Sequence, residues 1–355
     1  MATTSRNSSE EEQDAFWSNV YYNGSVAWFF VLEKINMKYI NIPGVKLPVS
    51  KIVYGTATEP FMGGGDGDEL FEAMLSLGIT TIDTAQNYTG AEVSIGKWLA
   101  RTGRREQVTI LSKCGHPDTS NWIPRVNEKE MRQDLNGSLR DLKTDYIDIY
   151  LLHRDDLKTD VGVAVEVFNA MHAEGKIRAF GGSNWDFRRI EAANEYAYAH
   201  NLIPFTVSSP NFGVARQVVD PYGGGCIGIT GEEHAEDRKW YAENQMAVIA
   251  YSGLARGFFS GKVKSTDETN VESLIDVFAV KAYAHPENFK RLKRAEELAV
   301  KKAATVSQIA LAYIFNSGLN ACAIVSTRSL ERMKQNVAAL DIVLSREEMD
   351  YLSLK

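Results

Sequence analysis

The segment DYIDIYLLH, residues 145–153, has the pattern of a buried β-strand and ends in a histidine, His153. Two further segments also end in a titratable residue: TTID ends at Asp83, and VTILSK ends at Lys113. Buried parallel strands are short, nearly continuous apolar runs of this kind. The three segments therefore predict three parallel strands, each followed by a side chain that can take part in proton transfer. Tyr88 lies five residues beyond Asp83.

Strand-like runs alternate with helix-like runs along most of the chain. The predicted strands are residues 52–54, 81–82, 108–111, 147–151, 177–180, 205–208, 247–250 and 323–325. The helix-like stretches include residues 69–77, 91–100, 128–142, 163–173, 187–200 and 286–303. Such an α/β pattern closes most simply into a (β/α)8 or TIM barrel, whose strands all end at one face. Asp83, Lys113 and His153 are therefore expected to converge there.

The regular pattern has additions. Residues 38–42 and 45–48, around Pro43-Gly44, predict an N-terminal β-hairpin. Long polar or glycine-rich segments at 213–237 and 262–273 predict loops at the C-terminal face of the barrel. Residues 1–36 differ in composition, so we expect an N-terminal extension, or sequence added before or lying upstream of a start at Met37, followed by a barrel domain at 37–355.

Composition limits the class of partner. The 355 residues are 44% hydrophobic, which is enough for a large core, and their net charge is −7. An acidic chain offers no diffuse positive field to nucleic acid or an anionic membrane, so we expect a small-molecule substrate. The three cysteines lack CxxC spacing, and the acidic N-terminal residues do not fit a signal peptide. We expect a cytoplasmic protein, with no metal site and an oligomeric state that the sequence does not indicate.

Each of the four polar residues also has a purely structural interpretation. Tyr88 could occupy a turn, Lys113 the surface and Asp83 a cap, and His153 could be a hydrogen-bonded structural residue. Their joint placement at predicted strand ends favours a common site instead. A phenol, an ammonium group, a carboxylate and an imidazole together are suited to proton transfer.

Five stretches, in this order, resemble the aldo-keto reductase family. They are GITTIDTAQNY at 78–88, LSK at 111–113, DYIDIYLLH at 145–153, GKIR at 175–178 leading to GSN at 182–184, and AYSGLARG at 250–257. The resemblance covers about residues 37–340. It implies hydride transfer from a nicotinamide to a carbonyl carbon. Tyr88 would protonate the oxygen, Lys113 would lower the tyrosine pKa, Asp83 would hold the lysine, and His153 would orient the substrate.

The resemblance also implies a dinucleotide cofactor. Ser183 and Asn184 match residues that bind the nicotinamide carboxamide, and Ser252, Leu254 and Gly257 match the loop around the pyrophosphate. Further candidate cofactor residues are Ser208, Ser326, Arg328, Arg332, Gln335 and Asn336. Arginines at a helix N-terminus suit a phosphate monoester, which favours NADP(H). NAD(H) remains an alternative, because Arg328 and Arg332 could also form a solvated helix face.

Two positions depart from the family pattern. The segment VSSPNF at 207–212 lacks the usual glutamine and the tyrosine that stacks on the nicotinamide, so Phe212 is a candidate only if the alignment shifts by one residue. Ser326 lies where many members have lysine. The loop residues His116, Trp122 and Trp185 are candidates for the substrate pocket, although aromatic residues beside strand ends are often core.

The resulting hypothesis is an NADP(H)-dependent oxidoreductase that reduces an aldehyde or ketone, such as a sugar or its derivative, with Tyr88 as the general acid. One alternative is an NAD-dependent sugar or alcohol dehydrogenase that runs in the oxidative direction. Another is a regulatory subunit that binds the dinucleotide without useful turnover.

Overall fold

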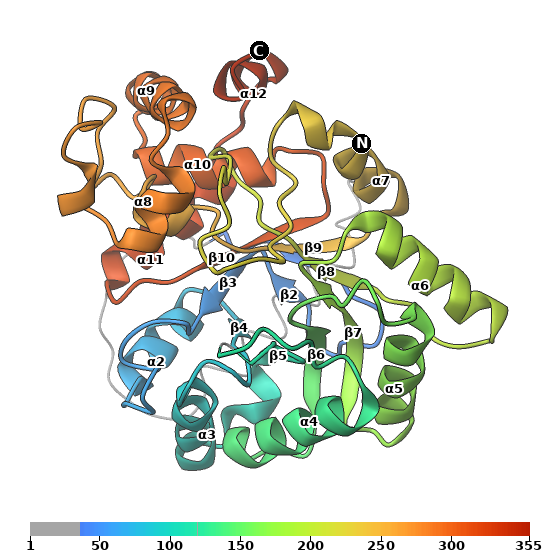
Figure 1. Ribbon diagram of the computed structural model, residues 1–355. Coiled ribbons are helices and arrows are strands. Elements are labelled where there is room, and N and C mark those ends of the chain that lie inside the picture. Colours follow the sequence, from blue (N-terminus) through green and yellow to red (C-terminus); the bar gives the residue numbers. More distant parts are fainter. Residues whose placement is uncertain (1–35, 119) are drawn as a thin grey trace, which may run out of the picture. The chain divides into compact units, whose positions relative to one another are not determined.

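The computed structural model describes residues 36–118 and 120–355, which we call the described residues. Eight parallel strands form a closed barrel in which each strand pairs with the next one along the chain, and β10 closes on β3 (Figure 1). The strands are β3 (Ile52–Gly55), β4 (Thr81–Asp83), β5 (Thr109–Cys114), β6 (Ile147–Leu152), β7 (Ile177–Ser183), β8 (Val207–Ser209), β9 (Ala247–Ala250) and β10 (Ala321–Val325). The predicted barrel and all eight predicted strands are confirmed.

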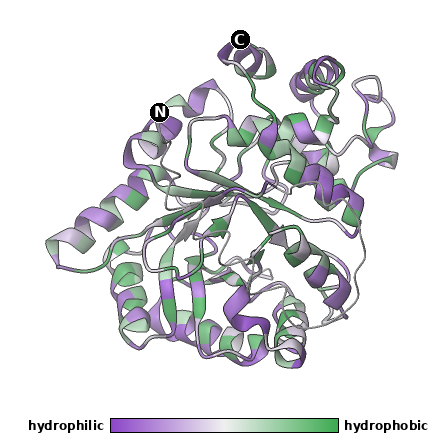
Figure 2. Cartoon of the chain, turned by 180° about the vertical axis from the view of Figure 1, so that it is seen from behind, coloured by the Kyte–Doolittle hydropathy of each residue, from purple (hydrophilic) through white to green (hydrophobic). Residues whose placement is uncertain are grey.

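Helices surround the barrel (Figure 1). They are α2 (Asp68–Ser76), α3 (Ala91–Thr102), α4 (Glu128–Leu142), α5 (Val161–Ala173), α6 (Phe187–Ala199), α7 (Ala235–Asn244), α8 (Val277–Tyr283), α9 (Pro286–Lys301), α10 (Val306–Phe315), α11 (Leu330–Ala338) and α12 (Arg346–Leu352). Side chains that accept the first free backbone N–H groups begin several of them, including Asn127 at α4 and Asp160 at α5. The strands are mostly apolar, whereas the surrounding helices also carry polar residues (Figure 2).

The N-terminal hairpin is present, but its second strand is not where the sequence predicted it. β1 (Tyr39–Ile40) pairs antiparallel with β2 (Val49–Ser50), whereas residues 45–48 were predicted to pair. The turn does begin at Pro43-Gly44, with the Val45 N–H donating to the Ile42 carbonyl. Pro48 has no N–H to donate to a ladder, so regular pairing resumes only after it.

Alternation along the strands divides the core into two clusters. One side of the sheet packs inside the barrel, where Val53, Leu111, Ile149, Val207 and Cys322 join hairpin residues Ile40, Ile42 and Val49. The opposite side, which includes Ile82, Ile110 and Tyr150, packs against the helices. Side chains two residues apart point to the same face of a strand. This alternation determines which polar residues at the strand ends can reach the barrel mouth.

The segment after β8 folds over the same face of the barrel. Asn211 forms isolated bridges with both Gly228 and Tyr251, which ties this segment to the end of β9. Most of the predicted 213–237 loop lacks regular structure, but its last part forms η2 (Glu232–His234) and the start of α7. Further short helical turns are η1 (Arg104–Gln107), η3 (Ala255–Gly257), η4 (Val271–Ser273) and η5 (Ala339–Asp341).

The described residues form one compact unit. The predicted extension at 1–36 lies almost entirely outside the described residues, so the predicted domain boundary stays a prediction. Within residues 36–118 and 120–355, no single helix is long and apolar enough to cross a bilayer. The pair α9 and α10 would pass that test together, but the pair is bent by 98° between the two helices.

Candidate active site

Strand alternation brings Asp83, Lys113 and His153 to the barrel mouth. Lys113 lies two residues beyond the inward-facing Leu111, and His153 lies two residues beyond the inward-facing Leu151. Asp83 pairs in register with both Gly55 and Leu111 of the neighbouring strands. Each of these three polar residues is at most 6% exposed. The barrel therefore holds three titratable groups in a largely water-excluded position.

Lys113 connects this group. Its Nζ donates to Asp83 Oδ1 at 2.5 Å and to the Thr84 carbonyl at 2.8 Å. The same Nζ lies 5.1 Å from the centre of the Tyr88 ring. The Tyr88 and His153 rings meet edge to face, 5.6 Å apart. The structure thus brings together all four predicted catalytic residues, which we call the catalytic cluster.

Charge and burial act in opposite directions on the catalytic cluster. Burial raises the pKa of Tyr88, the Lys113 ammonium partly offsets that rise, and the net direction is upward. Burial alone would lower the pKa of Lys113, but Asp83 and then Tyr88 outweigh it, so the pKa is raised and the lysine stays cationic. Burial, with Lys113 and Arg154, holds the pKa of His153 well below its usual value. Burial raises the pKa of Asp83, and the Lys113 ammonium partly offsets that rise. The directions of the other three pKa shifts favour a protonated phenol, a cationic lysine and a neutral imidazole.

Two of the three predicted pocket residues lie beside the catalytic cluster. The His116 ring is 4.9 Å from the His153 ring and 6.1 Å from the Trp122 ring. His116 and Trp122 are both partly exposed. The third, Trp185, is only 1% exposed and its ring packs against Phe205 at 5.3 Å, so the structure places it in the core.

Ser183 and Asn184 lie at the barrel mouth, but the protein already engages their polar atoms. Asn184 Nδ2 donates to the His153 carbonyl, and Asn184 Oδ1 accepts from the Tyr251 hydroxyl at 2.7 Å. Ser183 Oγ donates to the Ser209 carbonyl. Asn184 adopts a left-handed backbone with φ of 60°, which breaks strand alternation and turns its side chain toward His153. The Tyr251 contact was not predicted, because it joins residues 67 positions apart.

The loop after β9 has an unusual backbone. Ser252, Ala255 and Arg256 all have φ between 49° and 54°, and Gly257 has φ of 99°. A non-glycine residue in the left-handed region costs free energy, and such strain concentrates at binding sites. Turns of this kind can direct successive N–H groups toward an anion. Leu254, which is partly buried, packs against the main core beneath this loop.

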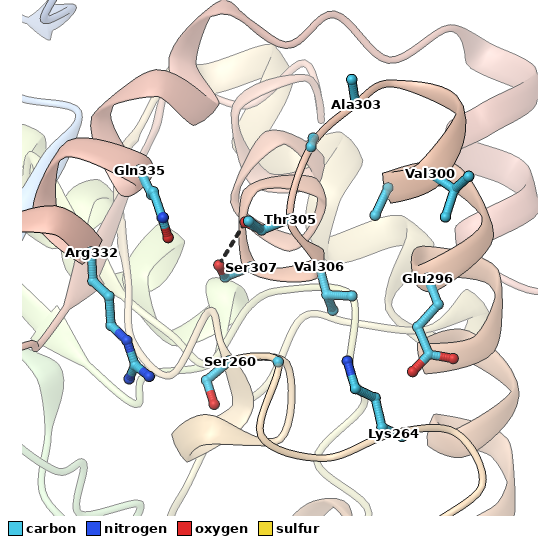
Figure 3. A pocket seen from close by; sticks show the side chains of 13 residues that line it. Ser260, Lys264, Glu296, Val300, Ala303, Thr305, Val306, Ser307, Arg332 and Gln335 are labelled. Atoms are coloured by element: carbon cyan, nitrogen blue, oxygen red, sulfur yellow. Dashed lines mark hydrogen bonds between the residues drawn. The ribbon is translucent and has the colours of Figure 1, made fainter.

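A pocket of about 690 Å³ lies between α9, the segment after η3 and α11 (Figure 3). Arg332 and Gln335 of α11 line one side of it, and Glu296 and Val300 of α9 line the other. Lys264 adds a second cationic side chain. We call this the α9–α11 pocket. Its remaining lining residues are Ser260, Gly261, Ala299, Ala303, Ala304, Thr305, Val306 and Ser307.

The other predicted cofactor residues are placed differently. Ser208 points to the outer side of the barrel. Its side chain is fully buried and its hydroxyl hydrogen-bonds to the Tyr241 hydroxyl of α7, so the structure does not bring Ser208 to the site. Phe212 is also buried, against Tyr313. Ser326 and Arg328 are exposed beyond β10, with Ser326 Oγ donating to the Gly55 carbonyl. Asn336 is buried on α11, one residue beyond Gln335 of the α9–α11 pocket.

One charged residue of the site was not identified from the sequence. Arg154 directly follows His153, is 7% exposed, and donates from Nη1 to the His153 carbonyl at 3.1 Å. A charge run such as HRDD at 153–156 ordinarily indicates a solvated loop, and the run does not indicate this burial. Among residues 36–118 and 120–355, no group of three or more His, Cys, Asp or Glu side chains is placed to hold a metal ion.

The family model for the aldo/keto reductase family matches residues 51–354, which is most of the chain and includes every residue of the catalytic cluster. The chain belongs to the aldo/keto reductase family. It is therefore an oxidoreductase, and members of this family generally bind NAD(P)H. The expected family membership is confirmed.

Named relatives of this aldo/keto reductase include a putative aryl-alcohol dehydrogenase, AAD14, of Saccharomyces cerevisiae. It is 27% identical over 330 residues, covering 84% of this chain and 79% of the relative. The aldo-keto reductase YhdN of Bacillus subtilis is 30% identical over 245 residues, covering 66% of this chain and 67% of the relative. The crystal structure of the thermostable aldo-keto reductase Tm1743 with the inhibitor epalrestat matches with a TM-score of 0.65 and 24% identity, covering 90% of this chain and 99% of that one. That likeness supports the shared fold.

Proposed function

We propose that this aldo/keto reductase is an NADP(H)-dependent enzyme that reduces an aldehyde or ketone to an alcohol, with Tyr88 as the proton donor. The observation that carries the proposal is the catalytic cluster. Lys113 forms an ion pair with Asp83 and lies 5.1 Å from the centre of the Tyr88 ring, and the His153 ring meets that of Tyr88 edge to face at 5.6 Å. Three buried groups with the partly exposed Tyr88 beside them suit general acid catalysis.

The residues of the cluster have complementary roles in this proposal. When bound, a nicotinamide would supply the hydride for the carbonyl carbon. Tyr88 gives its phenolic proton to the carbonyl oxygen, and the Lys113 ammonium stabilises the phenolate that remains. Asp83 holds the ammonium in position through the 2.5 Å contact. His153 is neutral at pH 7, because burial lowers its pKa, so it can orient the carbonyl by a hydrogen bond without adding charge.

The choice of NADP(H) rests on the α9–α11 pocket. Lys264 and Arg332 line it together with the hydroxyls of Ser260 and Ser307, and this donor set suits a phosphate monoester. The strained turn at residues 252–257 would hold the pyrophosphate between this pocket and the catalytic cluster. The negative charge of Glu296 would repel a phosphate in this pocket. Two hydrogen bonds, from the N–H and the hydroxyl of Ser265, partly satisfy its carboxylate.

A second direction of reaction has support from the relatives. Some are named aryl-alcohol dehydrogenases, including AAD14 and the probable enzyme AAD4 of Saccharomyces cerevisiae. The same catalytic cluster serves oxidation of an alcohol if Tyr88 accepts the proton. We therefore include aromatic alcohols and aldehydes among the candidate substrates, beside the sugar-like carbonyls expected from the sequence. We also keep the proposal of a cytoplasmic location, since the described cysteines are all free thiols.

The proposal is tested by titrating the purified protein with NADPH and NADH while following its tryptophan fluorescence. A panel of aromatic, aliphatic and sugar aldehydes, ketones and the corresponding alcohols is then assayed with the cofactor that binds more tightly. We expect tighter binding of NADPH together with turnover. Tighter binding of NADH would reverse the choice of cofactor and favour a dehydrogenase. Binding without turnover of any carbonyl or alcohol would favour a regulatory subunit, and binding of neither dinucleotide would contradict the proposed function.

A further inference from the structure

We propose that Arg154 is a specificity residue that binds a carboxylate on the substrate, so that the preferred substrates are aromatic aldehydes or alcohols that carry a carboxylate. This inference rests on the proposed function and narrows its substrate class. The observation behind it is that Arg154, beside the catalytic cluster, is buried and forms no ion pair with a carboxylate of the described residues.

The contacts of Arg154 leave much of its guanidinium group unused. The side chain is 7% exposed. Nη1 donates to the His153 carbonyl at 3.1 Å, and Nη2 contacts the Cys226 sulfur at 3.5 Å. Nε has no hydrogen-bond partner among the described residues. A guanidinium offers five N–H donors and cannot lose its charge in a protein, so a neutral carbonyl and a thiol satisfy it poorly.

Acidic residues near Arg154 in the sequence or in space are directed elsewhere. Asp155 makes two hydrogen bonds to Arg189, and Asp156 accepts from Thr159. Asp220, on the loop above, accepts from the backbone N–H groups of Tyr222 and Cys226. No carboxylate of residues 36–118 or 120–355 lies within 4.0 Å of the Arg154 guanidinium. An uncompensated buried charge is costly, and an anionic ligand would relieve that cost.

Arg154 is also the positive charge in excess at the catalytic cluster. The Lys113 charge is balanced by Asp83 in their ion pair. Burial is the main cause that lowers the pKa of His116 and His153, and the Arg154 charge adds to it. The same charge partly offsets the burial that raises the pKa of Tyr88. Its field thus reaches the catalytic cluster and the predicted substrate pocket. A substrate anion bound by Arg154 would lie close to the residues that orient and protonate the carbonyl.

The surroundings of Arg154 suit an aromatic substrate. The rings of His116 and Trp122 are 6.1 Å apart. The glycine turn at 223–225 lies above: a Cβ at Gly223 would meet the Trp122 ring at 2.9 Å, and one at Gly225 would meet the Arg154 side chain at 3.3 Å. Each of these glycines has φ of at least 79°, so larger residues would be strained there as well as crowded. The Trp122 ring and the Arg154 side chain therefore lie against the same glycine turn, so an aromatic group and a guanidinium are close together.

The test compares substrates that differ only in charge. The ratio of kcat/KM for 4-formylbenzoate to kcat/KM for its methyl ester is measured for the unmodified chain, with the cofactor that it binds better. The 3-formyl isomers are compared in the same way, because the distance between the carbonyl and the carboxylate is not specified in advance. We expect the carboxylate to be preferred about 10-fold or more, as for a charge-assisted bidentate hydrogen bond.

Variants then assign that preference to one residue. Arg154→Met should abolish it, raising KM for the carboxylate substrate far more than for the ester, and Arg154→Lys should retain part of it. Arg140→Met is the matched control, because Arg140 is 74% exposed on α4, and it should retain the preference. The Kd for the cofactor should change less than about 2-fold in Arg154→Met, which distinguishes a substrate contact from a pyrophosphate contact.

The outcomes separate this inference from the proposed function. Equal kcat/KM for acid and ester in the unmodified chain would overturn the carboxylate site and leave the reductase proposal standing. An equal loss on both substrates in Arg154→Met would show that Arg154 only positions the site, and would also overturn it. If no aldehyde is turned over with either cofactor, the proposed function fails and the inference fails with it. If Arg154→Met does not fold, the ratio in the unmodified chain and in Arg154→Lys decides.

Discussion

The catalytic cluster and the α9–α11 pocket hold their side chains in different ways. Asp83, Lys113 and His153 follow buried strands and are at most 6% exposed. Arg332 of the pocket is exposed on α11, and no ion pair is found for it within the described residues. Removing a group from the cluster therefore leaves a buried partner without compensation, whereas removing Arg332 leaves water in its place. In the proposed function, the groups that carry the chemistry therefore also support the stability of the barrel, whereas the group that selects the cofactor does not.

The largest expected effect is at Lys113. Lys113→Met should lower kcat/KM about 100-fold or more, because Tyr88 loses the cation that stabilises its phenolate. It should also lower the free energy of unfolding by about 3–5 kcal/mol, because Asp83 is left buried without a partner. Urea denaturation measures the second effect. The control Lys239→Met removes a lysine that is 73% exposed and should change stability by less than about 0.5 kcal/mol. Equal stability of the two variants would show that the buried ion pair contributes no more to folding than an exposed lysine does.

A second effect concerns the support beneath Lys113. Glu92 of α3 is 3% exposed and accepts a hydrogen bond from Ser112 at 2.6 Å. Burial raises the pKa of Glu92 to about 7, although Ser112 and Ser138 oppose the rise. In the folded chain the carboxyl group thus stays protonated to a higher pH than in the unfolded chain. Its contribution to stability is full below about pH 4.5 and is lost as pH rises through about 7.

Glu92→Gln should remove this pH dependence while keeping a neutral side chain of the same shape. Relative to the unmodified chain, the variant should gain up to about 3 kcal/mol of unfolding free energy at pH 8 compared with pH 5. His153 changes stability in the opposite sense, because burial lowers its pKa and the contribution is lost as pH falls. Since both chains contain His153, the difference between them isolates Glu92. If the two chains differ in unfolding free energy by the same amount at pH 5 and at pH 8, ionisation of Glu92 does not affect stability.

The smallest expected effect is at Arg332. It tests most directly whether the α9–α11 pocket acts separately from the catalytic cluster. Arg332→Gln should weaken NADPH binding about 10-fold by removing one charge-assisted contact, with little change for NADH and in stability. The two titrations are compared at one ionic strength, because an exposed charge is screened by salt. Arg346→Gln, at an arginine that is 82% exposed on α12, is the control. An equal loss for both dinucleotides would show that Arg332 does not bind the distinguishing phosphate.

The sequence predicted the barrel well, because its strands are short apolar runs in regular alternation with helices. It did not predict α10, in which seven of the ten residues are buried. A helix that packs on all sides has no apolar stripe to detect, so periodicity fails there. The hairpin was misplaced for a different reason: Pro48 ends the turn segment but cannot donate a ladder bond.

The candidate site divides in a similar way. The catalytic cluster could be predicted because strand ends share one face of a barrel. Ser208 was wrongly expected at the mouth, since one step of strand alternation turns it outward to Tyr241. Arg154 and Tyr251 could not be predicted, because their roles depend on contacts with residues 72 and 67 positions away. Their surroundings form only when the long loop after β8 folds over the barrel.

The most direct test of the central claim is the effect of Tyr88→Phe on turnover and on cofactor binding, measured on the same preparation. The substitution removes only the hydroxyl group, so the fold and the dinucleotide pocket should be preserved. We predict a loss of about 100-fold or more in kcat with the Kd for NADPH almost unchanged. Turnover within about 3-fold of the unmodified enzyme would show that Tyr88 is not the proton donor and would contradict the proposed mechanism.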